Sequence, residues 1–315
     1  AGRYRLKKRI GEGGMGEVWL AEQSGISRDV AIKFMHPDLL RHPTAKQRVI
    51  SEAKSLGKVA HSNIVNIFDF FETEDTVGLV LELVEGGSLA DLVESEGGLP
   101  PDRVVNLMLG ILKGLDALHD AGMIHRDIKP DNVLLAHEKG VTVPKITDLG
   151  IAQQEQGTRI TREGARLGTP EYMAPEQITS GETSVASDIY SCGVMMFEML
   201  TGAVPFSGTD FEIQSGHVHQ AMEPSSLPET TPAWLIASVL KAVAKKPDER
   251  FVSAEAFYAS LESKATPQLV STDSGVQAAK HAPADTLAAH PKKPQQKLAP
   301  APVAPSGAAS KGSKL

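Results

Sequence analysis

The chain has 315 residues, of which 41% are hydrophobic and 23% are charged, and its formal net charge is −7. A chain of this length can bury a substantial core, and its acidic balance excludes a general attraction to nucleic acid, so no nucleic-acid partner is expected. The single cysteine, Cys192, excludes an internal disulfide framework and is interpreted as a small buried thiol without a catalytic role.

No segment is predicted to cross a membrane. No stretch reaches the roughly 18 consecutive apolar residues that a spanning helix needs, and the start, AGRYRLKKRI, lacks the apolar region of a signal peptide. We therefore expect a cytoplasmic chain. Because it begins with Ala1 rather than Met, it is interpreted as a processed chain or a fragment, and tethering to a membrane through a longer protein stays open.

Residues 1–83 are predicted to form a small β-rich lobe. Short alternating or apolar runs such as EVWLAE, DVAIKFM and VGLVLELV are typical of strands. One segment around Ala45 to Val59 has the helical period of about 3.6 residues, with Val49, Ala53 and Leu56 on its apolar face. The expected arrangement is a sheet with one helix.

Residues 84–264 are predicted to form a larger, mainly helical lobe, so that the fold class is α+β with a cleft near Val84 to Ser88. Turn signals such as TGAVPFSGTD separate the helical segments. The predicted helices are Asp102–His119, Ser184–Leu200, Phe211–Gln220, Pro232–Ala244 and Ala254–Leu261.

The final segment, residues 265–315, differs in composition from the rest. It has no Phe, Tyr or Trp, and it contains seven Pro and six Lys against two Asp. Such a segment buries too little apolar surface to offset its chain entropy. It is predicted to be a disordered linker, with a weak electrostatic tether to an acidic surface as the alternative.

The first chemical motif is IGEGGMGEV, in which Gly11, Gly13 and Gly16 follow a G-x-G-x-x-G pattern. Alone the pattern is weak, because it also marks dinucleotide sites and glycine-rich hairpin turns. A dinucleotide fingerprint opens a helix, whereas the residues after Gly16 alternate as a strand. A glycine flap over phosphates is favoured, since a backbone without Cβ atoms can approach phosphate oxygens and offer its N–H groups.

The second motif, VAIK, ends at Lys33, and a carboxylate that could pair with this lysine lies in the next helix. Glu52 falls within the apolar stripe of that helix, where a charge requires a partner. Lys33 is one candidate; the alternative is Arg48 one turn earlier, which would keep Glu52 at the edge of the stripe. Periodicity allows both pairs, and Lys33 alone could be a strand end that reaches solvent.

The third motif, HRDIKPDN, places Asp127, Lys129 and Asn132 close together, and Asp148 follows in KITDLG. One carboxylate can accept the proton of a hydroxyl, while Asn132 and Asp148 offer the oxygen ligands that a hard divalent cation prefers. Lys129 can neutralise charge on a transferring phosphoryl group. A surface loop with ordinary ion pairs explains each residue singly but not the ordered set, so phosphoryl transfer is favoured.

Taken in order, these motifs resemble those of the eukaryotic-type (Hanks) protein kinases, and among them the bacterial serine/threonine kinases. The resemblance covers about residues 4 to 262 and includes GEGGMGEV, VAIK, HSNIV, HRDIKPDN, DLG, GTPEYMAPEQ and DIYSCGVMMFEMLTG. It implies a bilobal kinase domain over residues 1–264 that binds ATP and Mg²⁺ in the cleft and phosphorylates Ser or Thr of protein substrates.

The resemblance also implies roles for individual residues. Asp127 would be the catalytic base with Lys129 beside it, Asn132 and Asp148 would bind Mg²⁺, and Leu81 would be the gatekeeper. Glu52 would hold Lys33 on the α- and β-phosphates of ATP. The expected cofactor-binding residues are Ile10, Gly11, Glu12, Gly13, Gly14, Gly16, Val18, Ala31, Lys33, Glu52, Glu82, Val84 and Leu134.

Substrate class and the supports of the helical lobe follow from the same resemblance. Lys129 and Thr169 resemble the serine/threonine branch, because tyrosine kinases usually carry Ala-Ala-Arg or Arg-Ala-Ala in this loop. In the family pattern Glu176 pairs with Arg250, and Asp188 braces the catalytic loop, which is the HRDIKPDN segment.

An apolar spine is expected through Leu56, Ile67, His125 and Leu149, where Leu149 stands in place of the Phe that most family members have. Asp148, the expected metal ligand that precedes Leu149, is unaffected by this difference.

Regulation by phosphorylation is implied by Arg126, which precedes the catalytic Asp. In the family this indicates an activation segment ordered by a phosphate, and Thr158 and Thr161 are the expected autophosphorylation sites. Family members often dimerise through the small lobe, so a homodimer of that kind is an expected partner arrangement.

Two other function classes stay open at this point, since fold alone does not fix function. A catalytically inactive scaffold should lack at least one of Lys33, Asp127, Asn132 and Asp148, and all are present. A small-molecule kinase would usually lack GTPEYMAPE and DIYSCGVMMFEMLTG.

Overall fold

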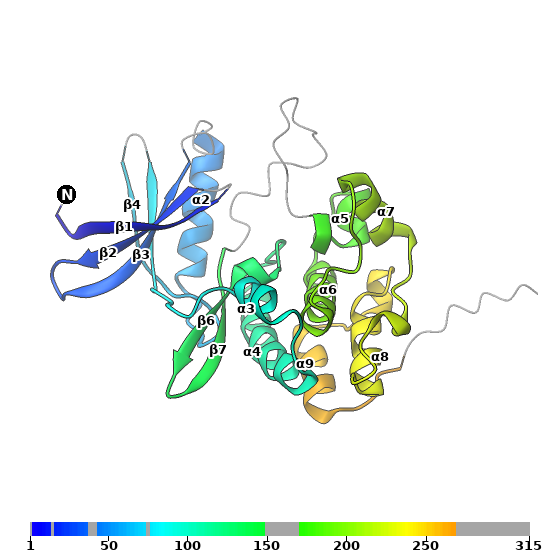
Figure 1. Cartoon of the computed structure of the whole chain (residues 1–315). Coiled ribbons are helices and arrows are strands. Elements are labelled where there is room, and N and C mark those ends of the chain that lie inside the picture. The colour runs from blue at the N-terminus through cyan, green and yellow to red at the C-terminus, as the bar shows by residue number, and fades with distance from the viewer. Residues whose placement is uncertain (1, 14–15, 37–42, 74–75, 149–169, 269–315) are drawn as a thin grey trace, which may run out of the picture. The chain divides into compact units, whose positions relative to one another are not determined.

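The computed structural model describes residues 2–13, 16–36, 43–73, 76–148 and 170–268. They lie in a compact unit, Ala1–Ser271, in which a β-sheet with one helix is followed by a mainly helical region (Figure 1). This arrangement confirms the predicted α+β class. The predicted linker lies outside the described residues from position 269 onward.

The first lobe is an antiparallel sheet with strand order β1-β2-β3-β5-β4. Helix α2 (Pro43–Leu56) lies beside it, and its predicted apolar face is confirmed because Val49, Ala53 and Leu56 are buried (Figure 1). The strands are β1 (Tyr4–Gly13), β2 (Gly16–Gln23), β3 (Arg28–Met35), β4 (Ile67–Glu72) and β5 (Val77–Leu81).

The second lobe contains helices and one two-stranded sheet, β6-β7. All five predicted helices are present, and their ends differ from the prediction by no more than two residues. The elements are α3 (Leu89–Glu96), α4 (Pro101–Asp120), β6 (Val133–Glu138), β7 (Val141–Ile146), α5 (Pro175–Thr179), α6 (Val185–Thr201), α7 (Asp210–His219), α8 (Ala233–Ala242) and α9 (Ala254–Ser263).

Helix α3 was not predicted, although its start carries a sequence signal. The Ser88 hydroxyl accepts a hydrogen bond from the N–H of Asp91, and the Asp91 carboxylate accepts one from the N–H of Ser88. This capping box satisfies two backbone donors at the helix start. The helix was not predicted because glycines flank it on both sides, which is typical of a loop. These glycines are at positions 86, 87, 97 and 98.

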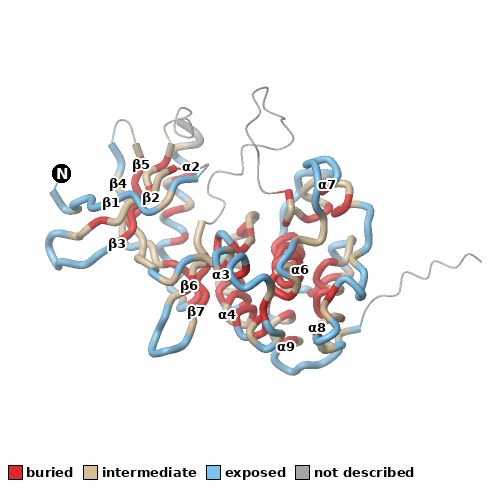
Figure 2. The backbone as a smooth tube through the Cα atoms, viewed as in Figure 1, coloured by how far each residue is buried: buried red, intermediate tan, exposed pale blue. Residues whose placement is uncertain are grey.

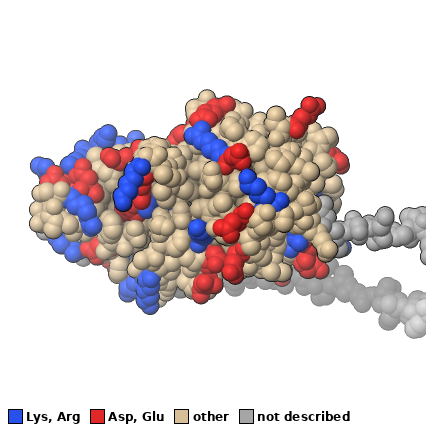
Figure 3. All heavy atoms as spheres, turned by 90° about the horizontal axis from the view of Figure 1, so that it is seen from below, with Lys and Arg blue, Asp and Glu red and all other residues tan. Residues whose placement is uncertain are grey.

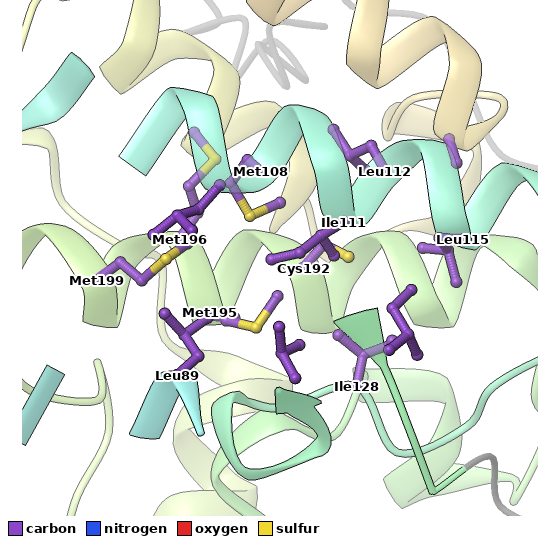
Figure 4. Close-up of a cluster of buried hydrophobic side chains, with 14 of the residues drawn as sticks. Leu89, Met108, Ile111, Leu112, Leu115, Ile128, Cys192, Met195, Met196 and Met199 are labelled. Carbon is purple, nitrogen blue, oxygen red and sulfur yellow. The ribbon is translucent and has the colours of Figure 1, made fainter. Parts of the chain in front are cut away.

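The core of the helical lobe lies between α4 and α6. Side chains including Met108 and Ile111 of α4 meet Met195 and Cys192 of α6, and Ile128 of the catalytic loop packs against the same cluster (Figure 4). Figure 2 shows the buried sides of these helices. Cys192 is fully buried, which confirms its interpretation as a buried thiol, and this burial raises its pKa.

Two basic residues of β1 pair with acidic residues of other strands. Arg5 lies 2.7 Å from Glu22 of β2, and Lys7 lies 2.6 Å from Asp29 of β3. Figure 3 shows Lys and Arg interspersed with Asp and Glu over this end of the molecule. None of the helices in the described part of the chain is long and apolar enough to cross a membrane.

Helix α7 is anchored through a buried histidine. The His217 ring is fully buried, with its Nδ1 2.9 Å from the hydroxyl of Tyr190, and Lys245 donates to the carbonyl of His217 at 2.7 Å. Burial, and then the charge of Lys245, lower the pKa of His217 to about 4, against a weaker opposing effect of the backbone carbonyl of Glu171, which favours a protonated ring. The folded chain therefore holds this imidazole neutral.

We expect His217 to make the fold acid-sensitive. Because its folded pKa lies below the unfolded value, the stabilisation is present above pH 6.5 and is lost as the pH falls towards 4, by about 3 kcal/mol. Urea unfolding across this range should give a steeper loss for the wild type than for His217→Gln. His219→Gln, an exposed change on the same helix, serves as the control, and equal pH slopes for wild type and His217→Gln would contradict the assignment.

Candidate active site

The catalytic loop between α4 and β6 brings three predicted residues together. The side-chain amide of Asn132 donates to the backbone oxygen of Asp127 at 2.7 Å and to its carboxylate Oδ2 at 2.9 Å. The ammonium of Lys129 lies 3.5 Å from the same Oδ2, and 15% of the Asp127 side chain is exposed. Both side-chain contacts use Oδ2 of Asp127.

Asp188 of α6 braces this loop, as predicted. Its buried carboxylate accepts hydrogen bonds from the backbone N–H groups of His125 and Arg126, each at 2.8 Å, and lies 2.9 Å from Nε2 of His119. Arg126 has a φ of +71°, a left-handed conformation that costs energy for a residue with a side chain. The charge-assisted hydrogen bonds from the N–H groups of His125 and Arg126 to Asp188 offset this strain.

Lys33 pairs with Asp148 in this structure. Its Nζ lies 2.6 Å from Oδ1 of Asp148, and only 8% of the Lys33 side chain is exposed. Glu52 lies instead with one oxygen 3.9 Å from the guanidinium of Arg126. No ion pair between described residues joins Lys33 to Glu52, so that pair stays a prediction for a different arrangement of the site.

A mainly apolar pocket extends from this ion pair between the sheet and β7. The predicted gatekeeper and two predicted spine residues, Leu56 and Ile67, are part of its wall, while His125 is buried beside it with its Nε2 3.0 Å from the Thr147 carbonyl. The lining residues are Lys33, Met35, Leu56, Val65, Ile67, Leu79, Leu81, Ile146, Thr147 and Asp148.

Three of the expected cofactor-binding residues, Val18, Ala31 and Leu134, lie on strands next to this pocket. Val18 is the register partner of Lys33, and Ala31 is the partner of Leu81. Leu134 of β6 forms an isolated bridge with Ser88, just after the segment that joins the lobes. Strand pairing therefore places these residues near the lysine, the gatekeeper and that segment.

The glycines of the flap differ in what the fold demands of them. At Gly16, with φ +151°, a Cβ would collide with the carbonyl oxygen of Phe34, so glycine is required there by the chain itself. A Cβ at Gly13 would meet nothing within 4 Å, and one at Gly11 only Val18 at ordinary contact distance. Ile10 and Glu12 beside them are exposed. The space over Gly11 and Gly13 is thus open to a ligand.

The segment that links β5 to α3, residues 82–88, joins the two lobes and is called the hinge; it carries Glu82 and Val84, two of the expected cofactor-binding residues. The N–H of Glu82 donates to the backbone oxygen of Asn66 at 2.9 Å, and Val84 is half-buried. At Gly86 the chain passes so close to β6 that a Cβ would collide with the backbone oxygen of Leu135. Glycine at this position lets the hinge rest against the second lobe.

The predicted pair of Glu176 and Arg250 is confirmed and is bidentate. The two guanidinium nitrogens lie 2.7 and 2.8 Å from the two carboxylate oxygens, and the Arg250 side chain is fully buried. Burial acts to raise the pKa of Glu176, but the hydrogen bonds and charge of Arg250 lower it overall. The pair joins α5 to the segment before α9.

Several predicted residues fall outside the described part of the chain. These are Gly14 of the flap, Leu149 of the spine, and Thr158, Thr161 and Thr169. The side chain of Arg48, the alternative partner of Glu52, is also outside it.

Comparison with known proteins decides the family. The family model described as "Protein kinase domain" matches residues 4–260. The chain belongs to the protein kinase family. The kinase fold is also found in the solved structure of Rad53 residues 1–466 in complex with AMP-PNP, with a TM-score of 0.69 at 26% identity, covering 82% of this kinase and 65% of that chain.

Curated relatives of the kinase are bacterial serine/threonine-protein kinases. It is 36% identical over 273 residues to the probable kinase PknB of Corynebacterium glutamicum, and 37% identical over 265 residues to PrkC of Bacillus subtilis. Each match covers 83% of this chain but only 42% and 40% of the relative. The kinase thus spans about two fifths of the length of these relatives.

The donor atoms of the site suit a magnesium ion. Asn132 uses its amide nitrogen on Asp127, so its carbonyl oxygen is available, and Asp148 has a second carboxylate oxygen beyond the one on Lys33. No group of three or more His, Cys, Asp or Glu that could hold a metal occurs among the described residues. Mg²⁺ keeps water and phosphate oxygens and needs only one or two protein ligands, so the two residues fit it.

Proposed function

We propose that this chain transfers the γ-phosphoryl group of ATP to Ser or Thr hydroxyls of proteins and phosphorylates itself. The observation that carries the proposal is the Asp127 carboxylate, which is oriented by Asn132, flanked by Lys129 and still partly exposed. A carboxylate held in this way can accept the proton of a hydroxyl without losing its orientation. The curated relatives that are named serine/threonine-protein kinases support the same conclusion.

In the proposed reaction, the substrate hydroxyl gives its proton to Asp127 while its oxygen forms a bond to the γ-phosphorus. The bond from the γ-phosphorus to the bridging oxygen breaks, and ADP leaves. Lys129, 3.5 Å from the Asp127 carboxylate, would neutralise charge on the transferring group. Asp188 keeps the loop in register for this step through the backbone of His125 and Arg126.

The nucleotide would be held by the glycine flap, Lys33 and the hinge. The open space over Gly11 and Gly13 admits phosphate oxygens, and the buried Lys33 supplies a cation. When bound, Mg²⁺ would neutralise phosphate charge, with Asn132 and Asp148 as its protein ligands.

Protein substrates, autophosphorylation and assembly belong to the same proposal. Thr158 and Thr161 are the proposed autophosphorylation sites. A homodimer through the small lobe is the proposed assembly.

The direct test is incorporation of the γ-phosphate of Mg·ATP into the chain and into a basic acceptor protein. We expect transfer by the wild type, abolished by EDTA, with phosphate mapped by mass spectrometry to Thr158 or Thr161. Lys33→Met should lower the rate about a hundredfold or more, whereas Lys46→Met, which removes a lysine paired with Glu72 at 2.8 Å, should not. Nucleotide binding without any transfer would favour an inactive scaffold.

A further inference from the structure

The segment of residues 170–179 lies beside the catalytic loop. It begins with a short 3₁₀ turn, Pro170–Tyr172, and ends with helix α5. The side-chain amide of Gln177 on this helix donates to the backbone oxygen of Arg126 at 3.3 Å, and Arg126 immediately precedes Asp127. A protein whose hydroxyl reaches the Asp127 carboxylate therefore lies next to the 170–179 segment.

This segment rests on a small hydrophobic cluster that is separate from the main core between α4 and α6. The Ser191 hydroxyl of α6 also donates to the carbonyl of Tyr172 at 2.8 Å. Because the cluster is small, polar contacts from α6 and α7 contribute much of what fixes the segment. The buried members of the cluster are Tyr172, Ala174, Tyr190, Val194 and Val243.

The imidazole of His217 is held in place by its neighbours. Its ring packs edge-on against Tyr190 and Phe206, with ring centroids 5.7 and 4.9 Å apart. Helix α7 approaches Phe206 so closely that a Cβ at Gly216 would collide with the phenyl ring. Lys245 donates to the carbonyls of Gly216 and His217, at 3.4 and 2.7 Å. The backbone and the ring of His217 are thus fixed together.

The two nitrogens of this ring face different groups, and that decides which of them carries the proton. Nδ1 lies 2.9 Å from the hydroxyl of Tyr190, while Nε2 is buried and makes no hydrogen bond of good geometry with a described residue. Helix α7 packs against the turn Pro170–Tyr172, whose Glu171 carbonyl favours a proton on the ring. A carbonyl only accepts, whereas a hydroxyl can donate. The neutral ring therefore accepts from Tyr190 at Nδ1 and directs an Nε2 proton at the carbonyl of Glu171.

We infer that His217 is a positioning residue for protein substrates, because its buried imidazole ties α6 and α7 to the backbone at Glu171 and so fixes the 170–179 segment beside Asp127. The inference rests on the proposed function. The ring acts through this segment rather than on the reacting atoms. Its loss should therefore weaken the binding of a protein acceptor and leave the binding of ATP unchanged.

The test is steady-state kinetics of the full chain with ATP and the basic acceptor protein. His217→Phe keeps a ring but removes both nitrogens, and Tyr190→Phe removes only the hydroxyl. Each should raise the KM for the acceptor about fivefold and leave the KM for ATP unchanged. His217→Gln should recover part of the loss, because an amide can accept from Tyr190 and donate to Glu171. His219→Phe makes the same substitution at an exposed position of α7 and is the control.

A second measurement does not depend on activity. Nuclear magnetic resonance of the imidazole nitrogens in the wild type should show His217 protonated on Nε2 at pH 7, and a ring protonated on Nδ1 would overturn the inference. If His217→Phe does not fold, Tyr190→Phe and this tautomer decide.

The kinetic outcomes separate the inference from the proposed function. An unchanged acceptor KM in Tyr190→Phe and His217→Phe overturns the role of His217. Equal rises in the KM for the acceptor and for ATP overturn it too, because they show a general loosening of the fold. Both results leave the proposed function intact. A wild type that transfers no phosphate to any protein overturns the proposed function and the role of His217 together.

Discussion

Replacing Asp127 with asparagine should reduce kcat for phosphoryl transfer by a factor of about 10² to 10⁴, because the amide cannot accept the proton of the substrate hydroxyl. The geometry of the loop should survive, since an amide oxygen can still accept the hydrogen bond from Asn132. The KM for ATP should change little, because Asp127 is proposed to act on the substrate hydroxyl rather than on the base or the phosphates of ATP. Steady-state kinetics with a protein acceptor would measure both constants.

Asp120→Asn makes the same change of charge at an exposed position at the end of α4 and is the matched control. It should leave kcat unaltered. If Asp127→Asn kept more than about a tenth of the wild-type kcat, proton transfer to this carboxylate would not be part of the rate-limiting chemistry.

Replacing Arg250 with methionine should lower the free energy of unfolding by about 3 to 5 kcal/mol, because it leaves the Glu176 carboxylate half-buried and without its cation. The guanidinium also donates to the backbone oxygens of Ala186 and Ala244, each at 2.8 Å, so three segments lose a common donor. Urea unfolding with an unchanged m-value would give the loss directly. Arg250→Lys should recover only part of it, because an ammonium cannot form the bidentate pair.

The contrasting variant is Arg103→Met, which breaks a pair with Glu96 of the same 2.7 Å length. Both of these side chains are about two fifths exposed, and such surface pairs contribute less than about 1 kcal/mol. If the two arginine variants lost similar stability, burial would not be the source of the Arg250 effect.

Periodicity and motif order predicted the lobes, five helices and the catalytic loop, because these depend on local patterns. The 3.6-residue stripe of Val49, Ala53 and Leu56 correctly predicts which face of α2 is buried, since the period of a helix is a property of its own residues. Helix α3 was not predicted because its eight residues are too few to show a clear hydrophobic periodicity.

The partners of the ion pairs could not be predicted from the sequence, since they depend on where elements that are far apart in the chain meet. Periodicity allowed Glu52 to face Lys33 or Arg48. The structure pairs Lys33 with Asp148, a residue 115 positions away in sequence, and brings Glu52 near Arg126, while the pair with Arg48 stays a prediction. The burial of Lys145 could not be predicted from the sequence either, because a lysine in a short strand usually points to solvent. Only the packing of β7 under the hinge identifies it as buried.

The ion pair between Lys33 and Asp148 has a consequence for the order and strength of ligand binding. Each group neutralises the other across 2.6 Å, so a ligand that draws one of them away leaves the other with an uncompensated charge. An anion on Lys33 thereby raises the affinity of Asp148 for a cation, and a cation on Asp148 raises the affinity of Lys33 for an anion by the same factor. The two ligands of this site are therefore thermodynamically coupled through the Lys33–Asp148 pair.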